Sequence, residues 1–298
     1  MSLTLTSVTA RTPWQSVLHL KIGADCQRVF CFIGGFSQAM SAWRYFQDDV
    51  IKGSSDGIVL IGRRHEVEPG YVGLTSLADQ IDEVDAAITW IITHYLKGAP
   101  LVLIGHSVGG LIAREVTARH LDKVHSLIQI APVPIQRFAL LGNSKFWTNG
   151  GIRAALTAPM GILNSRGYIP PIASVRGLFT GKVPENDFWQ YIGELVPDSV
   201  RVFIELMVFY DGTKTWNIIK ENLRGQNIIV VAPADKTTPR ARLETMAKRQ
   251  GDIRYLAAGT PHCIQFAPEL DRRHNADILR DVFGMCMASG RSTLRGRG

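Results

Sequence analysis

The stretch LVLIGHSVGG, residues 101–110, joins an apolar run to a serine that has glycine two positions before it and two positions after it. The residues GHSVG at 105–109 fit the pattern G-x-S-x-G, in which a strand turns sharply into a helix. Such a turn leaves no room for side chains at either glycine, and it lifts the serine hydroxyl to the N-terminus of the helix, where developing negative charge is stabilised. Ser107 is therefore the candidate nucleophile, although glycine-rich turns after strands also occur for packing reasons.

A serine hydroxyl is a poor nucleophile without a base, and the base needs a third group to hold it. The segment NIIVVAPADKTTP, 227–239, runs from an apolar strand into a turn that contains Asp235. The carboxyl edge of a strand is where sheet enzymes of this kind keep their chemistry. A turn aspartate is the structural alternative, but the preceding strand, LIQIAPVPIQ at 127–136, offers no acid. Asp235 is therefore the candidate acid.

The candidate base is His262, in DIRYLAAGTPHCIQFAPEL at 252–270, where a strand leads through a Gly-Thr-Pro turn to the imidazole. Pro261 restricts Thr260 to extended conformations, so the loop is expected to be stiff. The other histidines are expected to have structural or surface roles: His19, His65, His94, His106, His120, His125 and His274.

A serine nucleophile also needs backbone N–H donors for the oxygen of the tetrahedral intermediate. The residue after the nucleophile, Val108, is expected to supply one donor. The second is expected from Phe36, in the loop after strand 28–33, where Gly34 and Gly35 let the main chain approach closely. A plain Gly-Gly turn is the structural alternative.

Alternating β-rich and helical patterns surround these motifs and predict a mostly parallel sheet of eight strands covered on both faces. The stretch 76–96 has helical spacing, with Ser76 and Asp79 as its capping residues. A later helix is expected to begin with an Asp198/Ser199 cap. The expected strands are 3–8, 15–22, 28–33, 57–62, 101–105, 124–131, 227–232 and 253–258.

The regular alternation fails between the sixth and seventh strands, where a single crossover helix would need far fewer residues than the chain provides. We expect a helical cap over 133–222, rich in large apolar side chains, on an α/β core formed by 1–132 and 223–287. Most aromatic residues of the insert are expected to build its own small core. The basic tail 288–298 is expected to be disordered.

Composition narrows the function further. The chain has 298 residues, 46% of them hydrophobic, and a net charge of +7, part of which lies on the arginines of the tail. It has no basic helix or aromatic-interleaved stripe that would indicate nucleic-acid binding. Its four cysteines lack CxxC spacing, and no apolar run is long enough to span a membrane. We expect a cytoplasmic protein without a membrane span; the sequence does not indicate its oligomeric state.

These motifs together resemble the α/β-hydrolase fold superfamily over nearly the whole chain to about residue 287. The resemblance rests on IGGFSQAMSAW, GHSVGG, APADKTTP and GTPHCIQFAPEL, in the order Ser, Asp, His. Gly34 departs from the family, because many members have histidine there, and Ala232 stands where glycine often precedes the acid turn. A serine at 107 argues against haloalkane dehalogenase or epoxide hydrolase chemistry, and Cys263 stands where plant-type hydroxynitrile lyases carry lysine.

The resemblance implies a serine hydrolase that works through an acyl-enzyme on Ser107. The bulky apolar residues of the insert 133–222 indicate that its substrate is a medium-sized, largely apolar carboxylic ester or lactone. Asp235 and His262 would complete the catalytic triad, and Phe36 and Val108 the oxyanion hole. No metal or organic cofactor is implied, and the partner is a small ester-like molecule. The alternatives are non-ester chemistry on the same fold, such as C–C bond hydrolysis or a lyase reaction, and a non-catalytic ligand-binding member.

Overall fold

A computed structural model gives the fold of the chain. It describes residues 7–11, 16–22, 26–43, 56–63, 75–96, 98–136, 142–163, 167–180, 183–223, 225–238, 240–250, 252–264, 267 and 269–292.

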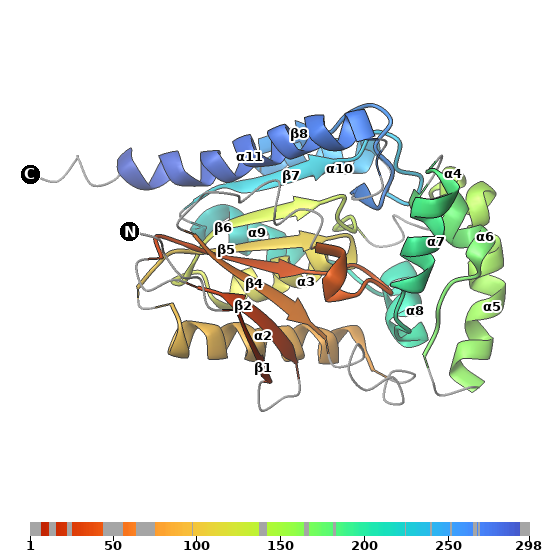
Figure 1. Cartoon of the computed structure of the whole chain (residues 1–298), viewed down its shortest axis with the longest axis horizontal. Helices are drawn as coiled ribbons and strands as arrows, with labels where there is room; N and C mark the ends of the chain where they lie inside the picture. Colours follow the sequence, from red (N-terminus) through yellow and green to blue (C-terminus); the bar gives the residue numbers. More distant parts are fainter. Residues whose placement is uncertain are drawn as a thin grey trace, which may run out of the picture.

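One sheet runs through the molecule, with its strands in the order β1-β2-β4-β3-β5-β6-β7-β8 (Figure 1). β2 pairs antiparallel with β1 and with β4, whereas the pairs from β4 to β8 are parallel. The predicted eight-stranded, mostly parallel sheet is confirmed. The strands are β1 Ser7–Arg11, β2 Val17–Lys21, β3 Val29–Ile33, β4 Gly57–Gly62, β5 Leu101–His106, β6 Val124–Ile130, β7 Asn227–Val231 and β8 Asp252–Tyr255.

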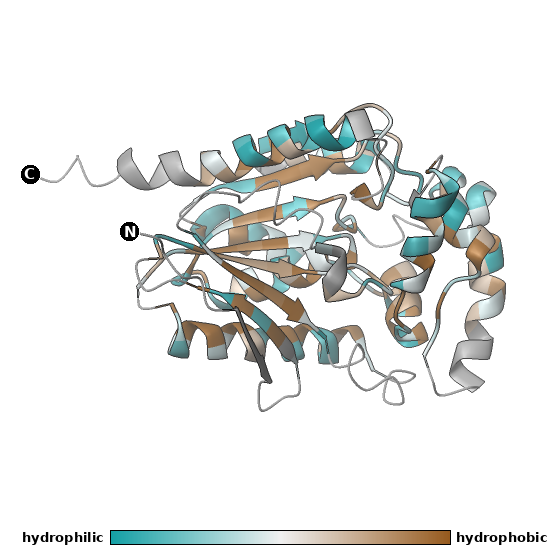
Figure 2. Cartoon of the chain, viewed as in Figure 1, coloured by the Kyte–Doolittle hydropathy of each residue, from teal (hydrophilic) through white to brown (hydrophobic). Residues whose placement is uncertain are grey.

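The strands β3, β4 and β5 are buried along their whole length because helices cover both faces of the sheet. In β3, alternate side chains enter different clusters: Cys31 and Ile33 pack with α2 and α3, and Phe30 and Phe32 pack with α11. Figure 2 shows the same division, with hydrophobic strands inside and the hydrophilic residues of α11 on its outer side. The helices around the sheet are α2 Leu77–His94, α3 Val108–Arg119, α9 Thr213–Asn222, α10 Arg240–Gln250 and α11 Glu269–Ser292, with the short 3-10 helix η1 at Met40–Trp43.

The predicted amphipathic helix at 76–96 is α2, and both of its predicted capping residues are confirmed. The Ser76 hydroxyl accepts from Asp79 N–H at 3.1 Å, and the Asp79 carboxylate accepts from Ser76 N–H at 2.7 Å. The hydrogen bonds of this capping box lower the pKa of Asp79. The strand boundaries are less well predicted: the first strand lies at Ser7–Arg11 rather than 3–8, whose residues 3–6 lie outside the described residues.

Short helices follow β6 and lie beyond the carboxyl ends of the parallel strands (Figure 1). The division into a core of 1–132 and 223–287 with a cap of 133–222 stays a prediction. Its last helix, α9, contacts α3, and Ile219 belongs to the same cluster as the sheet residues. The other elements of this region are α4 Ser144–Phe146, η4 Trp147–Gly151, α5 Ile152–Leu163, α6 Ile172–Val175, η5 Arg176–Thr180, α7 Glu185–Gly193 and α8 Val200–Val208.

The last helix, α11, runs to Ser292, so the beginning of the predicted tail, 288–292, belongs to this helix. The rest of the tail, 293–298, lies outside the described residues. Among the helices of the described part, none is both long and apolar enough to cross a bilayer.

Candidate active site

Ser107 lies at the turn between β5 and α3, with φ 55° and ψ −119°. Positive φ is rare for a residue with a side chain, and such strain is held only where the surroundings fix the backbone. Here Ser107 N–H donates to the carbonyl of Ile130 at 2.9 Å, and Gly110 N–H donates to the Ser107 carbonyl at 3.0 Å. The sharp strand-to-helix turn predicted from the sequence is present.

The two glycines of the motif are required sterically. A Cβ at Gly105 would overlap the backbone of Gly109, and a Cβ at Gly109 would overlap the carbonyl oxygens of Ile33 and Gly34. The start of α3 therefore packs directly against the main chain of β5 and against the end of β3. No rotamer change could relieve these overlaps, because all the atoms concerned belong to the backbone.

We expect Gly109→Ala to lower the free energy of unfolding by about 2–4 kcal/mol, because it forces the main chains of α3 and β3 apart. The matched control is Gly284→Ala in α11, where an added Cβ meets no atom within 4 Å. Alanine loses less conformational entropy than glycine when the helix forms, so this control should be about 0.5–1 kcal/mol more stable than the wild type. Urea denaturation measures both values; equal stability of the two variants would contradict the tight turn.

The structure brings Ser107, Asp235 and His262 together. The imidazole Nε2 of His262 lies 2.9 Å from Ser107 Oγ, and its Nδ1 lies 2.7 Å from Oδ2 of Asp235. All three side chains are buried. Because a carboxylate can only accept a hydrogen bond, Nδ1 carries the ring proton, and Nε2 is free to accept the proton of Ser107. The distances fit a nucleophile, a base and an acid that fixes the tautomer of the base.

The other carboxylate oxygen of Asp235 is also held. Its Oδ1 accepts from the N–H groups of Thr237 and Thr238, at 2.6 and 3.1 Å. These two bonds fix the carboxylate so that Oδ2 faces the imidazole. Asp235 lies in the turn after β7, as predicted, and the backbone of this turn orients its carboxylate.

His106 was expected to have a structural or surface role, but the sequence did not show which groups it contacts. Its ring lies between two loops of the site, with Nδ1 2.9 Å from Gln38 Oε1 and Nε2 2.8 Å from the carbonyl oxygen of His262. Burial, together with the neighbouring His262, lowers the pKa of His106 to about 3, so the ring is neutral. A neutral ring carries a single N–H and can donate to only one of these two oxygens, so His106 lies between the loop after β3 and the loop that carries His262 and hydrogen-bonds to one of them. Its place directly before Ser107 was the only signal in the sequence.

Cys263, next to His262, is not available as a nucleophile. It is buried, and its Sγ lies 3.1 Å from the hydroxyl of Tyr191 in α7. Burial raises the pKa of the Cys263 thiol to about 12, which keeps it protonated and unreactive.

The loop after β3 leaves one of its amide groups available. Gly35 N–H donates to Gln38 Oε1 at 2.8 Å, Ser37 N–H donates to Asp198 at 3.0 Å, and Gln38 N–H donates to the Gly35 carbonyl at 3.2 Å. Of these consecutive amides, that of Phe36 has no partner among the residues that the structure describes. This matches the prediction that Phe36 N–H serves as an oxyanion donor, a role that stays a prediction for both Phe36 and Val108.

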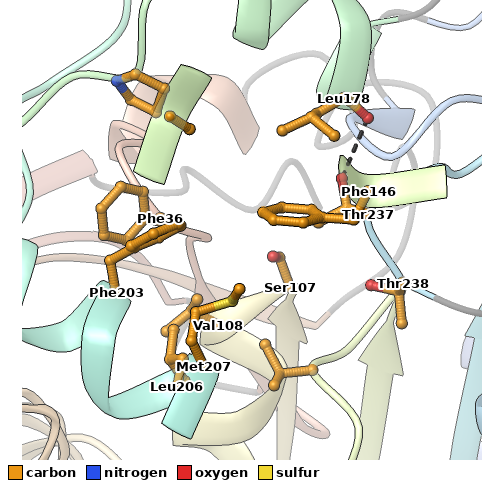
Figure 3. A pocket seen from close by; sticks show the side chains of 13 residues that line it. Phe36, Ser107, Val108, Phe146, Leu178, Phe203, Leu206, Met207, Thr237 and Thr238 are labelled. Atoms are coloured by element: carbon orange, nitrogen blue, oxygen red, sulfur yellow. Dashed lines mark hydrogen bonds between the residues drawn. The ribbon is translucent and has the colours of Figure 1, made fainter. Parts of the chain in front are cut away.

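Ser107 opens onto an apolar pocket (Figure 3). In this view its hydroxyl points toward the ring of Phe146, and Phe36 and Phe203 lie together to one side of it. Apart from Ser107, the polar lining consists of two threonines, Thr237 and Thr238, and none of the described lining residues carries a charge. The pocket walls come from the loop after β3 and from α4, η5 and α8, and include Phe36, Phe146, Leu178, Phe203, Leu206 and Met207.

Arg63, which follows β4, is buried, so it lies neither on the surface nor within reach of a substrate carboxylate. Its side chain is 0% exposed and pairs with Asp198. Arg64 lies outside the described residues. The described part of the chain contains no group of three or more His, Cys, Asp or Glu side chains that could hold a metal ion.

Comparison with known proteins agrees with this fold. The sequence profile of the Alpha/beta hydrolase family matches residues 32–270. A search of curated protein sequences finds no significant match. Similar solved structures include olei00960, a hydrolase from Oleispira antarctica, with a TM-score of 0.63, 13% identity, and coverage of 90% of this chain and 94% of that chain.

Two further structures are similar to this one. A carboxylesterase structure from the thaumarchaeon Nitrososphaera gargenis has a TM-score of 0.63 and 16% identity, and the match covers 94% of this chain and 99% of that chain. A thermophilic esterase from Thermogutta terrifontis has a TM-score of 0.59 and 13% identity, with coverage of 94% and 97%. Such low identities show a shared fold and nothing finer. The family match spans well over half of the sequence, so the chain belongs to the alpha/beta hydrolase family.

Proposed function

We propose that the protein is a serine hydrolase that cleaves a medium-sized, largely apolar carboxylic ester or lactone through an acyl-enzyme on Ser107. The observation that carries this proposal is the unbroken chain of hydrogen bonds from Asp235 through His262 to Ser107, at the edge of an apolar pocket. It supplies a nucleophile, a base and an orienting acid in the positions that acyl transfer requires.

In the first half of the reaction, Ser107 Oγ attacks the carbonyl carbon while His262 Nε2 takes the hydroxyl proton. The carbonyl oxygen becomes an oxyanion, which accepts hydrogen bonds from the N–H groups of Phe36 and Val108. Asp235 stabilises the imidazolium by electrostatic attraction. The tetrahedral intermediate then collapses: the bond to the alcohol oxygen breaks, and His262 gives its proton to that oxygen.

In the second half, a water molecule attacks the acyl-enzyme as His262 Nε2 takes one of its protons. The same two amides hold the second oxyanion. Collapse breaks the bond to Ser107 Oγ, which recovers its proton from the imidazolium, and releases the carboxylic acid. In this scheme the protein's own residues perform every proton transfer.

The uncharged lining of the pocket favours a neutral substrate. Bringing a charged group into an apolar site without a partner costs several kcal/mol, and the described lining residues offer no countercharge. Aromatic rings from two sides, including Phe36, Phe146 and Phe203, can instead bury an alkyl or aryl acyl group.

A matched pair of esters tests this selectivity. We expect kcat/KM for p-nitrophenyl pentanoate to exceed that for mono-p-nitrophenyl succinate by about 100-fold or more, because the two acyl groups have similar size but only the succinate brings an unpaired carboxylate into the pocket. Initial rates of p-nitrophenol release, corrected for spontaneous hydrolysis, give the ratio. Equal values would show that the acyl group does not enter this pocket.

The function itself is tested with a series of p-nitrophenyl esters of increasing acyl length, hydrolysed by the wild type and by Ser107→Ala. The proposal predicts a maximum at medium chain length and no activity above background in the variant. Ester hydrolysis by Ser107→Ala within about tenfold of the wild-type rate would overturn it. Absence of esterase activity in the folded wild type would favour C–C bond chemistry or ligand binding on the same fold.

A further inference from the structure

The loop that carries Phe36 is bound to the segment 195–199, which leads into α8. The two segments form an antiparallel bridge, and Val196 N–H donates to the carbonyl of Ser37 at 3.1 Å. Ser37 N–H in turn donates to Oδ2 of Asp198 at 3.0 Å. Ser37 has φ 54°, a conformation that a residue with a side chain keeps only where its neighbours hold it. The segment before α8 supplies that support.

Asp198 belongs to a buried ion pair beneath the loop. Oδ2 of Asp198 lies 3.3 Å from Nη2 of Arg63, and both side chains are 0% exposed. Gln80 of α2 joins the pair: its Nε2 donates to Asp198 Oδ1 at 2.7 Å, and its Oε1 accepts from Arg63 Nη1 at 3.0 Å. Nη2 of Arg63 also donates to the carbonyl of Gly35. This cluster of Arg63, Gln80 and Asp198 thus holds the loop on both sides of Phe36.

The contact with Gly35 determines where the Phe36 N–H points. The Gly35 carbonyl and the Phe36 N–H belong to one planar trans peptide, so they point in opposite directions. Because the guanidinium of Arg63 binds the Gly35 carbonyl, the Phe36 N–H points away from Arg63. A cation on the carbonyl also polarises the peptide, which makes its N–H a stronger donor. Asp198 fixes the following peptide through Ser37 N–H.

We infer that Arg63 and Asp198 are positioning residues of the oxyanion hole: their buried pair aims the Phe36 N–H at the oxygen that develops charge on attack by Ser107. This inference rests on the proposed function. The segment before α8 then supports the oxyanion hole, because it supplies Asp198. Its partner Arg63 comes from a distant part of the chain, directly after β4. Neither residue touches the substrate, since both are fully buried.

The test is the double variant Arg63→Met/Asp198→Asn, which removes both charges at once. Removing one partner alone would leave an uncompensated buried charge, which is strongly destabilising. We expect kcat for p-nitrophenyl pentanoate to fall by at least about 10-fold, towards the about 10²–10³-fold that loss of one oxyanion donor costs. KM should stay near the wild-type value, because the donor acts mainly on the transition state.

A transition-state analogue provides the readout that a purely structural role would not move. n-Butylboronic acid forms a tetrahedral adduct with an activated serine, so its inhibition constant should rise by about the same factor as kcat falls. The matched control is Arg28→Met/Asp56→Asn, which removes a partly buried pair, 12% and 5% exposed, with N–O distances of 3.0 and 2.7 Å. That pair lies at the opposite end of β3, away from the pocket, so kcat should not change.

Two single variants keep the inference testable if the double variant does not fold. Arg63→Lys retains a buried cation that can reach the Gly35 carbonyl but lacks the second arm of the guanidinium, so it should give a kcat between those of the wild type and the double variant. Gln80→Met removes the bonds that join the pair to α2 and should lower kcat with little change in KM. Wild-type kcat in both single variants would overturn the inference.

The inference and the proposed function fail in distinguishable ways. An inactive wild-type protein would overturn the proposed function, and the positioning role with it. An active wild type with unchanged kcat in the Arg63→Met/Asp198→Asn variant would overturn only the positioning role. An equal loss of kcat in the control pair Arg28→Met/Asp56→Asn would do the same, because it would show a general effect of losing a buried ion pair.

Discussion

Replacing Ser107 with alanine is expected to lower kcat for p-nitrophenyl pentanoate by about 10⁵–10⁶-fold, because nucleophile and base act as one unit and the base is useless without the hydroxyl. The protein should stay folded, since the change removes one oxygen atom and leaves the elbow glycines in place. KM for any residual activity should change little, because the apolar walls provide the binding. Steady-state kinetics and circular dichroism measure these quantities.

The matched control is Ser126→Ala, which makes the same chemical change at another buried serine. Ser126 lies in β6 and accepts a hydrogen bond from Gln226 N–H at 3.1 Å, away from the pocket. Its kcat should equal that of the wild type, although its stability is expected to fall. If Ser107→Ala kept a kcat within about tenfold of the wild type, Ser107 could not be the nucleophile.

The second large effect is expected from Asp235→Asn, which should lower kcat by about 10⁴-fold while keeping the shape of the site. Oδ1 of Asp235 accepts from two backbone N–H groups, those of Thr237 and Thr238. An asparagine must keep its oxygen on that side, so its NH₂ group would face Nδ1 of His262. Nδ1 then has to accept, and the ring proton moves to Nε2, the nitrogen that must take the proton from Ser107.

Kinetics at neutral pH, with a structure of the variant, test this tautomer argument. The control is Asp252→Asn on the exposed edge strand β8, which should keep the wild-type kcat. A kcat for Asp235→Asn within about tenfold of the wild type would mean that another group orients His262, or that the orientation of the ring does not limit the reaction.

The sequence was sufficient to predict the sheet and the convergence of Ser107, Asp235 and His262. Each of these residues follows a strand, and in a parallel sheet the carboxyl ends of the strands meet at one edge. The glycines around Ser107 added a steric signal that needs no tertiary information. The order strand, turn, helix and the single residue between Ser107 and each of the two glycines are local properties, which a sequence shows directly.

The buried cluster of Arg63, Gln80 and Asp198 could not be predicted in this way. Asp198 precedes a helix, so the sequence favoured a capping role; instead, its carboxylate pairs with Arg63, while Ser199 takes the N-cap position without a side-chain cap bond. Arg63 is a charged residue directly after a strand, which is typical of a surface position. Only the packing of the segment before α8 against the loop after β3 makes both residues interior, and that packing has no signature in local sequence patterns.

The region after β6 was predicted as helical, but not its irregular geometry. The helical turn η4, Trp147–Gly151, has non-helical dihedral angles at Asn149 and Gly150. Gly151 lies where a Cβ would overlap the ring of Phe146, so the irregular turn lets Phe146 pack closely beside the pocket. Glycines in the sequence signal a break, whereas the direction of the chain after that break depends on contacts with α6 and η5.

The central claim is that the hydroxyl of Ser107 is made reactive by His262 and Asp235, and covalent labelling tests it most directly. The native protein is treated with a fluorophosphonate, and the adduct is located by mass spectrometry of its peptides. The account predicts one phosphonylated residue, Ser107, with labelling abolished in His262→Ala. A folded wild-type protein that stays unlabelled at Ser107, or that is labelled equally well without His262, would contradict the account.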